Sequence, residues 1–128
     1  MEKRRLSALE IVGVMLITAV VGAVLWSQQG IASARERDIT RKTAINHVYY
    51  YLETIYYPAH HFYPDMLVAT QLPGLDAKYL KDPDGKSAGD VGSNIHYDPL
   101  RCDQGACSGY TLRSGLELEA DFTKTSNR

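Results

Sequence analysis

The sequence predicts an α+β fold: a long N-terminal α-helix, half transmembrane and half exposed and amphipathic, packed on a small antiparallel β-sheet head. Three observations lead to this prediction. An apolar run starts at Leu6, a helical pattern continues from it without proline as far as Tyr57, and the C-terminal part alternates apolar and polar residues as β-strands do. The remainder, from Pro58 onward, is too short to bury a generous core alone. We therefore expect the second half of the helix to complete the core of the head.

Composition divides the chain into four segments. They are a short basic leader (1–5), a transmembrane helix (6–26), an amphipathic continuation of that helix (27–57) and a small globular head with antiparallel strands (58–128). At about 1.5 Å per residue, the second segment spans a hydrocarbon core of roughly 30 Å. Because Lys3, Arg4 and Arg5 precede it, we expect a single pass through the cytoplasmic membrane, with the head on the extracytoplasmic side.

Glu10 is the one carboxylate inside the apolar run. Burial of a charge in a bilayer costs about a few kcal/mol, so this carboxylate needs a partner. No Lys or Arg lies between Leu6 and Ser33, so we expect the cation on another chain, which points to assembly between helices. The alternatives are a plain signal anchor and a signal peptide cleaved after Ala32 or Ala34, and neither explains the carboxylate.

The segment Leu6-Ser7-Ala8-Leu9-Glu10, followed by an apolar helix, resembles the mature N-terminus of type IV pilins and type II secretion pseudopilins. The resemblance implies that a prepilin peptidase removes the leader and that Leu6 becomes a methylated N-terminus. It also implies that Glu10 pairs with the free amine of a neighbouring pilin-like subunit, in a homo- or hetero-oligomeric filament built by inner-membrane machinery. Arg5 stands where the family has glycine; if it prevents cleavage, Glu10 must pair with Arg4, Arg5 or a foreign subunit.

The rest of the chain is similar to small pilin-like proteins in the order of its motifs. These motifs are a Tyr-Leu segment at Tyr79-Leu80-Lys81, an Asp-Pro-x-Gly turn at Asp82 to Gly85, a strand at Asn94 to Leu100, a cysteine loop at Cys102 to Cys107 and a terminal strand at Tyr110-Thr111-Leu112. Some secretion pseudopilins bind calcium in the equivalent loop, where this chain has Asp82, Asp84 and Asp90. Because the terminal glutamate of an EF-hand is missing, we expect no metal and no cofactor.

The second half of the helix carries an apolar stripe at helical spacing, with a charged stretch before it. The stripe consists of Ile45, Val48, Tyr49, Leu52, Ile55 and Tyr56. The charged residues are Arg35, Glu36, Arg37, Asp38, Arg41 and Lys42. We expect them to form a solvated face, with Asp38 paired to Arg41 or Lys42. Pro58 disfavours helical geometry at the preceding residue, so the helix is expected to end at Tyr57.

Between the helix and the strands, the sequence predicts short turns and one loop. A proline-started short helix is expected from Pro64 to Ala69, a break at Leu72 to Leu75, and a helical turn from Asp76 to Leu80. The composition of residues 81–94 is that of a loop.

The C-terminal strands are predicted from their alternation. One face carries Tyr110, Leu112, Ser114, Leu116, Leu118, Ala120 and Phe122. Because Gly115 keeps this parity, we expect one long bent strand in preference to a hairpin at Ser114-Gly115. Its antiparallel partner is predicted at Asn94 to Leu100, with Ile95 and Tyr97 facing inward.

Cys102 and Cys107 lie between these two strands, and beyond the membrane helix they meet an oxidising compartment. We therefore expect a disulfide that staples the hairpin. A metal site would need further ligands, and the spacing of His60 and His61 to the cysteines fits no zinc pattern, so both histidines are expected at the surface.

The motifs of common enzymes are absent from the sequence, so we expect no catalytic activity. A net charge of −1 gives no general case for nucleic-acid binding. One basic patch could contact DNA on a filament, but we expect it to face neighbouring acidic subunits or solvent, and it consists of Arg35, Arg37, Arg41 and Lys42. We predict a structural subunit of a type IV pilus or pseudopilus-like filament at the cell surface, serving adhesion, motility, DNA uptake or secretion. The alternative is a single-pass membrane-anchored protein-binding module that uses a tyrosine-rich face, namely Tyr49, Tyr50, Tyr51, Tyr56, Tyr57 and Tyr63.

Overall fold

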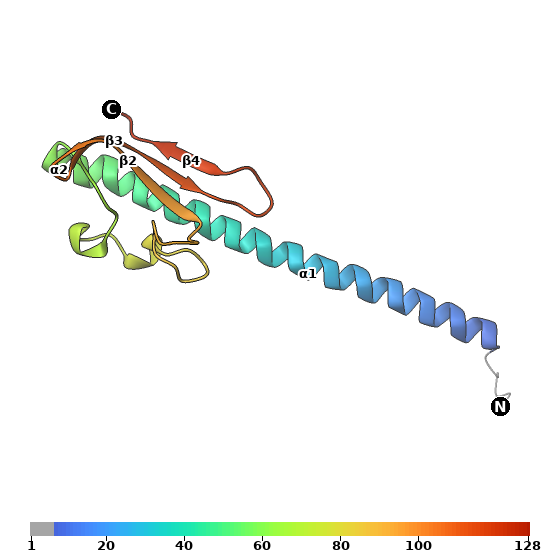
Figure 1. Cartoon of the computed structure of the whole chain (residues 1–128). Coiled ribbons are helices and arrows are strands. Elements are labelled where there is room, and N and C mark those ends of the chain that lie inside the picture. Colours follow the sequence, from blue (N-terminus) through green and yellow to red (C-terminus); the bar gives the residue numbers. More distant parts are fainter. Residues whose placement is uncertain (1–6) are drawn as a thin grey trace. The chain divides into compact units, whose positions relative to one another are not determined.

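The structure is a computed structural model and describes residues 7–128. Its fold is α+β, with one long N-terminal helix and an open antiparallel sheet (Figure 1). The chain divides after Ala34 into two units, and each is described by itself. The first contains the apolar start of helix α1 (Ala8–Tyr51), and the second contains the end of that helix and the sheet. The basic leader and the expected processing residues Arg5 and Leu6 lie outside the described residues.

The helical path continues past α1 through one π-helical turn, η1 (Leu52–Tyr56), into a short helix, α2 (Tyr57–His60). The prediction that Pro58 ends the helix at Tyr57 is therefore wrong. Proline in an α-helix clashes with the carbonyl four residues earlier and lacks the N–H that would bond to it. In the wider turn the N–H of Tyr57 donates to the Leu52 carbonyl five residues back, so the α-helical register is already interrupted where the proline enters.

The π turn also decides which residues of the predicted stripe are buried. Ile45, Val48 and Leu52 are fully buried as expected, whereas Ile55 is 56 % exposed, so its assignment to the core was wrong. A π turn rotates the chain less per residue than an α-turn does, which carries Ile55 away from the core. Tyr56, which lies on the stripe at either helical period, is 7 % exposed and is buried as expected.

The sheet is built around one central strand, β3 (Ala106–Ser114). Strand β2 (Ile95–Asp103) pairs with one edge of β3. On the opposite edge, β1 (Tyr63–Pro64) pairs with the start of β3 and β4 (Phe122–Thr125) pairs with its end. All pairings are antiparallel, and the buried side chains of the sheet join those of the helix in one core.

The prediction of one long bent strand ending at Phe122 is wrong. Strand β3 ends at Ser114, the chain reverses through residues 115–121, and Phe122 pairs back to Ser114. An odd number of residues separates this pair, so a reversal preserves the same alternation that a continuous strand would show. The inward positions up to the reversal, Tyr110 and Leu112, are fully buried as predicted.

The predicted partner strand is confirmed as β2, which extends three residues farther than expected, to Asp103. Ile95 is buried, and the half-buried Tyr97 donates its hydroxyl to the Pro64 carbonyl at 2.6 Å. Pro99 lies within β2, which is at the edge of the sheet. Proline is tolerated in an edge strand because its missing N–H is not needed for a bond to a further strand.

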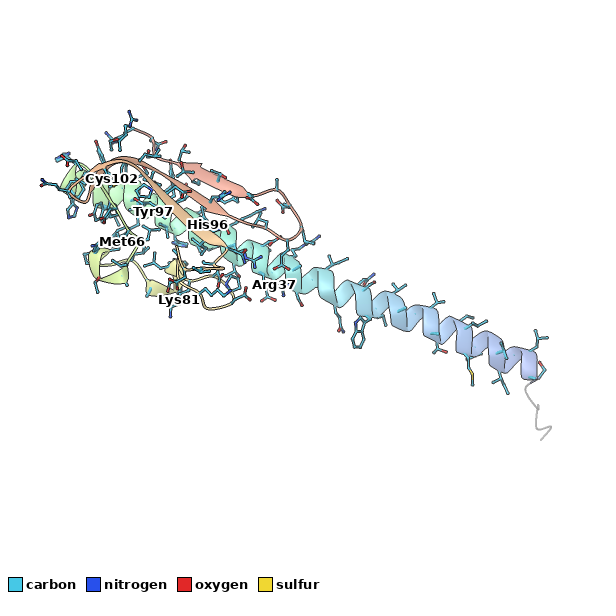
Figure 2. All side chains as sticks on the ribbon, viewed as in Figure 1. Arg37, Met66, Lys81, His96, Tyr97 and Cys102 are labelled. Carbon is cyan, nitrogen blue, oxygen red and sulfur yellow. A yellow bond between two sulfur atoms is a disulfide. The ribbon has the colours of Figure 1, made fainter. Side chains whose placement is uncertain are left out.

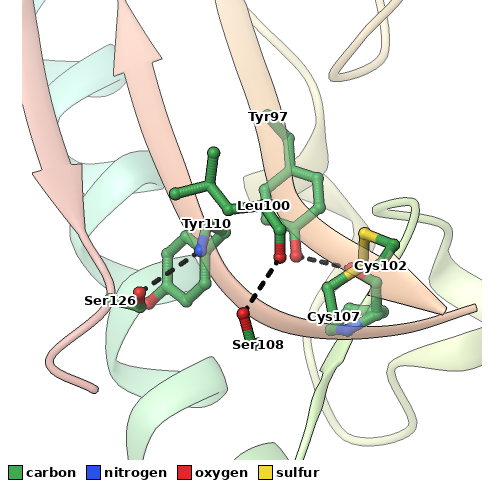
Figure 3. Close-up of a disulfide and its surroundings, with 8 residues drawn as sticks. Tyr97, Leu100, Cys102, Cys107, Ser108, Tyr110 and Ser126 are labelled. Atoms are coloured by element: carbon green, nitrogen blue, oxygen red, sulfur yellow. Dashed lines mark hydrogen bonds between the residues drawn. A yellow bond between two sulfur atoms is a disulfide. The ribbon is translucent and has the colours of Figure 1, made fainter.

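The β2–β3 hairpin closes through a two-residue turn. Gln104 and Gly105 both have positive φ, 48° and 85°, which is the geometry of a type I′ turn. Cys102 and Cys107 face each other directly behind it and form the predicted disulfide (Figure 3). The expected staple of the hairpin is therefore confirmed.

The segment between the helix and β2 contains two short 3-10 helices, η2 (Ala69–Gln71) and η3 (Ala77–Leu80). The predicted helix starting at Pro64 is wrong, because Pro64 belongs to β1 and pairs with Ala106. The turn predicted at Asp76 is confirmed, with the Asp76 carboxylate accepting the N–H of Lys78 as a cap.

Candidate functional site

The apolar part of α1 exposes large hydrophobic side chains on every side (Figure 2). At its two ends, Leu9 is 85 % exposed and Trp26 is 83 % exposed. A helix that is apolar all round has no solvated face and is suited to a lipid environment or to burial among other helices. Residues 7–128 thus contain one helix that is long and apolar enough to cross a membrane.

The hydroxyl groups within this apolar part bond to the helix itself. Thr18 donates to the carbonyl of Val14 at 2.5 Å, and Ser27 donates to the carbonyl of Val24 at 2.8 Å. Hydroxyls satisfied in this way need no water, so they are compatible with a hydrocarbon surrounding.

Glu10 forms a capping box with Ser7 at the start of α1. The N–H of Ser7 donates to Oε2 of Glu10 at 2.8 Å, while the N–H of Glu10 lies 3.3 Å from the Ser7 hydroxyl oxygen. This capping role was not predicted, although Ser-x-x-Glu before an apolar run is its signature. The carboxylate also lies at the N-terminal end of the helix, where the helix dipole is positive.

The capping box uses only one of the two carboxylate oxygens of Glu10. Oε2 accepts from both the N–H and the hydroxyl of Ser7, whereas Oε1 accepts no hydrogen bond within residues 7–128. A cation from another chain can therefore approach Oε1 without breaking the cap. The geometry reconciles a local role in starting the helix with the intermolecular role expected from the sequence.

The charged stretch that follows is a solvated face only at Arg35 and Glu36, and its other four residues form ion pairs within the chain. Arg37 forms a two-pronged contact with Glu117 at 2.8 and 2.6 Å, and Lys42 reaches Glu119 at 2.5 Å. Arg41 is only 3 % exposed and contacts Glu117 at 2.8 Å. These basic residues are therefore committed to the loop between β3 and β4 of their own chain, and the patch expected to meet solvent, acidic subunits or DNA is largely neutralised.

Asp38 is the buried centre of this contact, at 3 % exposure. Its carboxylate accepts the N–H groups of Glu117 and Leu118, both at 2.9 Å, and forms the predicted pair with Arg41 at 3.1 Å. Burial alone would raise the pKa of Asp38, but these bonds outweigh it, so its pKa is lowered. Hydrogen bonds from Arg37 and Arg41 likewise lower the pKa of Glu117 to about 2.

No protein family, curated protein or solved structure matches this chain. Its function is therefore inferred from its own residues and their arrangement.

The tyrosine-rich segment forms core and not a recognition face. Tyr51, Tyr56 and Tyr63 are buried, and of the six tyrosines in the proposed face only Tyr50 is exposed. The side chain of Glu53 accepts the hydroxyl of Tyr63 at 3.0 Å and that of Tyr110 at 2.9 Å. Burial, followed by these bonds to a carboxylate, raises the pKa of both phenols well above its usual range.

The remaining candidate residues lie apart from any cluster. His60 and His61 are exposed as predicted, with His60 stacked on Tyr56 at 4.2 Å. Asp82 is buried and accepts the N–H groups of Asp84, Lys86 and Asn94, so it organises the loop of residues 81–94. Within residues 7–128, no group of three or more His, Cys, Asp or Glu side chains is arranged to hold a metal ion.

Proposed function

We propose that this chain is a structural subunit of a type IV pilus or pseudopilus-like filament, assembled through its apolar N-terminal helix. The observation that carries the proposal is Glu10, whose carboxylate stands at the start of an all-round apolar helix and keeps one oxygen uncommitted. In this proposal the helix first holds the subunit in the cytoplasmic membrane, with the head outside. It then packs against the helices of neighbouring subunits, which replace lipid on its exposed apolar sides.

The proposed role of Glu10 is to accept the cation of the neighbouring subunit at Oε1. Processing at Leu6 would supply a free amine for this contact, and the N–H of Ser7 would still be present to hold Oε2 in place. The carboxylate would thus be oriented before assembly, and its pairing would fix the axial position of each added subunit. A prepilin peptidase and the inner-membrane assembly machinery are the partners that this mechanism requires.

The architecture of the second unit agrees with this role. The helix end packs beneath a small antiparallel sheet, and the ion pairs around Asp38 tie the β3–β4 loop to the same helix. A head attached in this way would stay with its helix when the subunit leaves the membrane.

Two substitutions at Glu10 separate assembly from helix capping. Glu10→Gln keeps a side chain that can accept the Ser7 N–H but removes the charge, whereas Glu10→Ala removes both. We expect both variants to reach the membrane and neither to appear in filaments sheared from cells that carry the assembly machinery. Ser7→Ala, which removes the capping hydroxyl and keeps the charge, is the matched control and should still assemble.

The result for Glu10→Gln decides the proposal. Normal filaments from this variant would leave Glu10 with a capping role only and overturn its proposed role in assembly, whereas failure of the unaltered chain to enter filaments would favour a membrane-anchored binding module. The intact mass of the recovered protein gives a second, independent test, because a filament subunit should begin at Leu6 and an anchored module should retain the leader.

A further inference from the structure

A polar hollow of about 410 Å³ opens between the end of the helix, strand β1 and the tip of the β2–β3 hairpin. Its wall includes two aromatic rings, a proline and three polar side chains, namely Tyr56, Phe62, Pro64, Asp65, Gln71 and Gln104. The volume lies within the range of sites that bind small molecules. The hollow therefore has the size to accept one or two rings of a ligand.

Four polar groups in this wall are free to bind. The carboxylate of Asp65, the amides of Gln71 and Gln104, and the hydroxyl of Tyr56 make no hydrogen bond or ion pair with any group in the described part of the chain. The residue Tyr56 is 7 % exposed, but its hydroxyl is not among the buried polar atoms that lack a partner, so this hydroxyl meets solvent in the hollow. Its ring is held between His60, stacked at 4.2 Å, and Phe62, edge-on at 6.1 Å.

The backbone at Gln104 gives a second observation. Its φ of 48° lies in the left-handed region, where a type I′ turn favours Asn, Asp or Gly. A glutamine here accepts conformational strain, and such strain recurs where a side chain is needed for binding. The turn places this long amide in the wall of the hollow, which the end of the helix also lines.

The combination of donors and acceptors limits the class of ligand. The two amides supply N–H donors and carbonyl acceptors, the carboxylate only accepts, and the phenol does both. A cationic ligand would leave the amide donors unused, and an anionic ligand would be repelled by Asp65. Hydroxyl groups both donate and accept, so a neutral ring bearing several hydroxyls satisfies all four groups.

We propose that this hollow binds a neutral saccharide unit, with Asp65, Gln71, Gln104 and Tyr56 as its hydrogen-bonding residues. Every residue of the site belongs to the second unit of a single chain, so the proposal does not depend on filament assembly. It would give the head a carbohydrate-binding activity in addition to its structural role.

The test is a titration of the isotope-labelled full chain in detergent micelles, followed by amide NMR spectra. The probes are D-galactose, D-glucose and N-acetyl-D-glucosamine, with N-acetyl-lysine amide as the cationic comparison. We expect at least one sugar to shift the backbone signals of Asp65, Gln71, Gln104 and Gly105. The lysine derivative should leave these signals unchanged.

Variants of the wall connect those shifts to the site. Gln71→Ala and Gln104→Ala should each weaken binding about fivefold, the effect of one net hydrogen bond, and the double variant should lose it. Tyr56→Phe should weaken binding to a similar degree without lowering thermal stability, because the hydroxyl has no partner in the fold. Asp98→Asn, an exposed carboxylate outside the wall, is the control and should bind as the unaltered chain does.

The proposal fails if none of the sugars shifts these signals, or if N-acetyl-lysine amide shifts them in place of the sugars. It also fails if Tyr56→Phe destabilises the head and leaves sugar binding intact, because the hydroxyl would then serve the fold alone. Since the variants at Gln71 and Gln104 remove exposed side chains without partners in the described chain, their folding is not at risk.

Discussion

Asp38 accepts the backbone N–H of Glu117 at 2.9 Å, although 79 positions separate the two residues in the chain. Through this bond, one helical carboxylate determines where the β3–β4 loop lies. Contacts of this kind recur within the second unit, where charged or phenolic groups join the helix to the sheet and the β3–β4 loop.

Asp38→Ala should destabilise the head by roughly 2 to 4 kcal/mol, because it leaves the buried Arg41 and two N–H groups without their partner. Urea unfolding followed by near-ultraviolet circular dichroism measures the change. Glu36→Ala, at an exposed position in the same turn of helix, should have almost no effect. Equal effects of the two substitutions would contradict the central role of Asp38.

Stability should fall in acid. The pKa of Glu117 is about 2 in the folded chain against 4.5 for a free glutamate, and that of Asp38 is also lowered. A lowered folded pKa stabilises above the unfolded value, and this stabilisation is lost as the pH drops toward the folded value. The thermal midpoint should therefore be level near neutrality and fall below about pH 4.5. The thermal midpoint of Glu117→Gln should depend less on pH in this range. A midpoint of the unaltered chain that is the same at pH 3 as at neutrality would contradict the prediction.

The buried phenols should act at the opposite end of the pH range. The folded pKa of Tyr63 and Tyr110 is raised above 10, so the stability they contribute is present below that pH and is lost as the pH rises further. In an ultraviolet titration, these two should ionise only when the head unfolds. If all tyrosines ionise together near pH 10 in the folded chain, the contact with Glu53 is not maintained.

Tyr110→Phe should cost about 1 to 3 kcal/mol, because it removes a hydrogen bond to a carboxylate in the core. The matched control is Tyr50→Phe, which alters an exposed ring. Urea unfolding of the two variants under identical conditions makes the comparison. A loss of stability in the control as large as that in Tyr110→Phe would contradict the prediction.

Removal of the disulfide by Cys102→Ser with Cys107→Ala should cost about 2 kcal/mol, as loop-closure entropy implies for so short a loop. The hairpin register should survive, since the turn at Gln104 and Gly105 and the ladder between β2 and β3 are independent of the sulfurs. Cross-strand NMR contacts between Tyr97 and Leu112 measure the register. Their loss in the variant would show that the disulfide sets the pairing.

Local periodicity was sufficient for the main elements. The spacing of Ile45, Val48 and Leu52 placed the buried side of the helix correctly, and alternation placed Tyr110 and Leu112. These signals work because burial on one face repeats with the period of the element.

The errors arose where a distant partner or a change of helical period decides the outcome. The burial of Ile55 was predicted wrongly because no sequence pattern indicates the π turn. The reversal before Phe122 was not predicted because it preserves the alternation of apolar and polar residues. The burial of Asp38 depends on backbone N–H groups far along the chain, which no local pattern reveals. For the candidate site, Glu10 was found from the cost of a charge in an apolar run, whereas its bond to Ser7 needed only a capping motif that was overlooked.

The π turn at Leu52–Tyr56 has a consequence for comparing this chain with others. A π turn accommodates one residue more than an α-turn, so it is the structural trace of a single inserted residue. Relatives with one residue fewer between Tyr51 and Pro58 should lack this wide turn, so their proline should clash with the carbonyl four residues earlier and kink or end the helix. Chain length at this point should then separate sequences whose helix continues past the proline from those whose helix stops there.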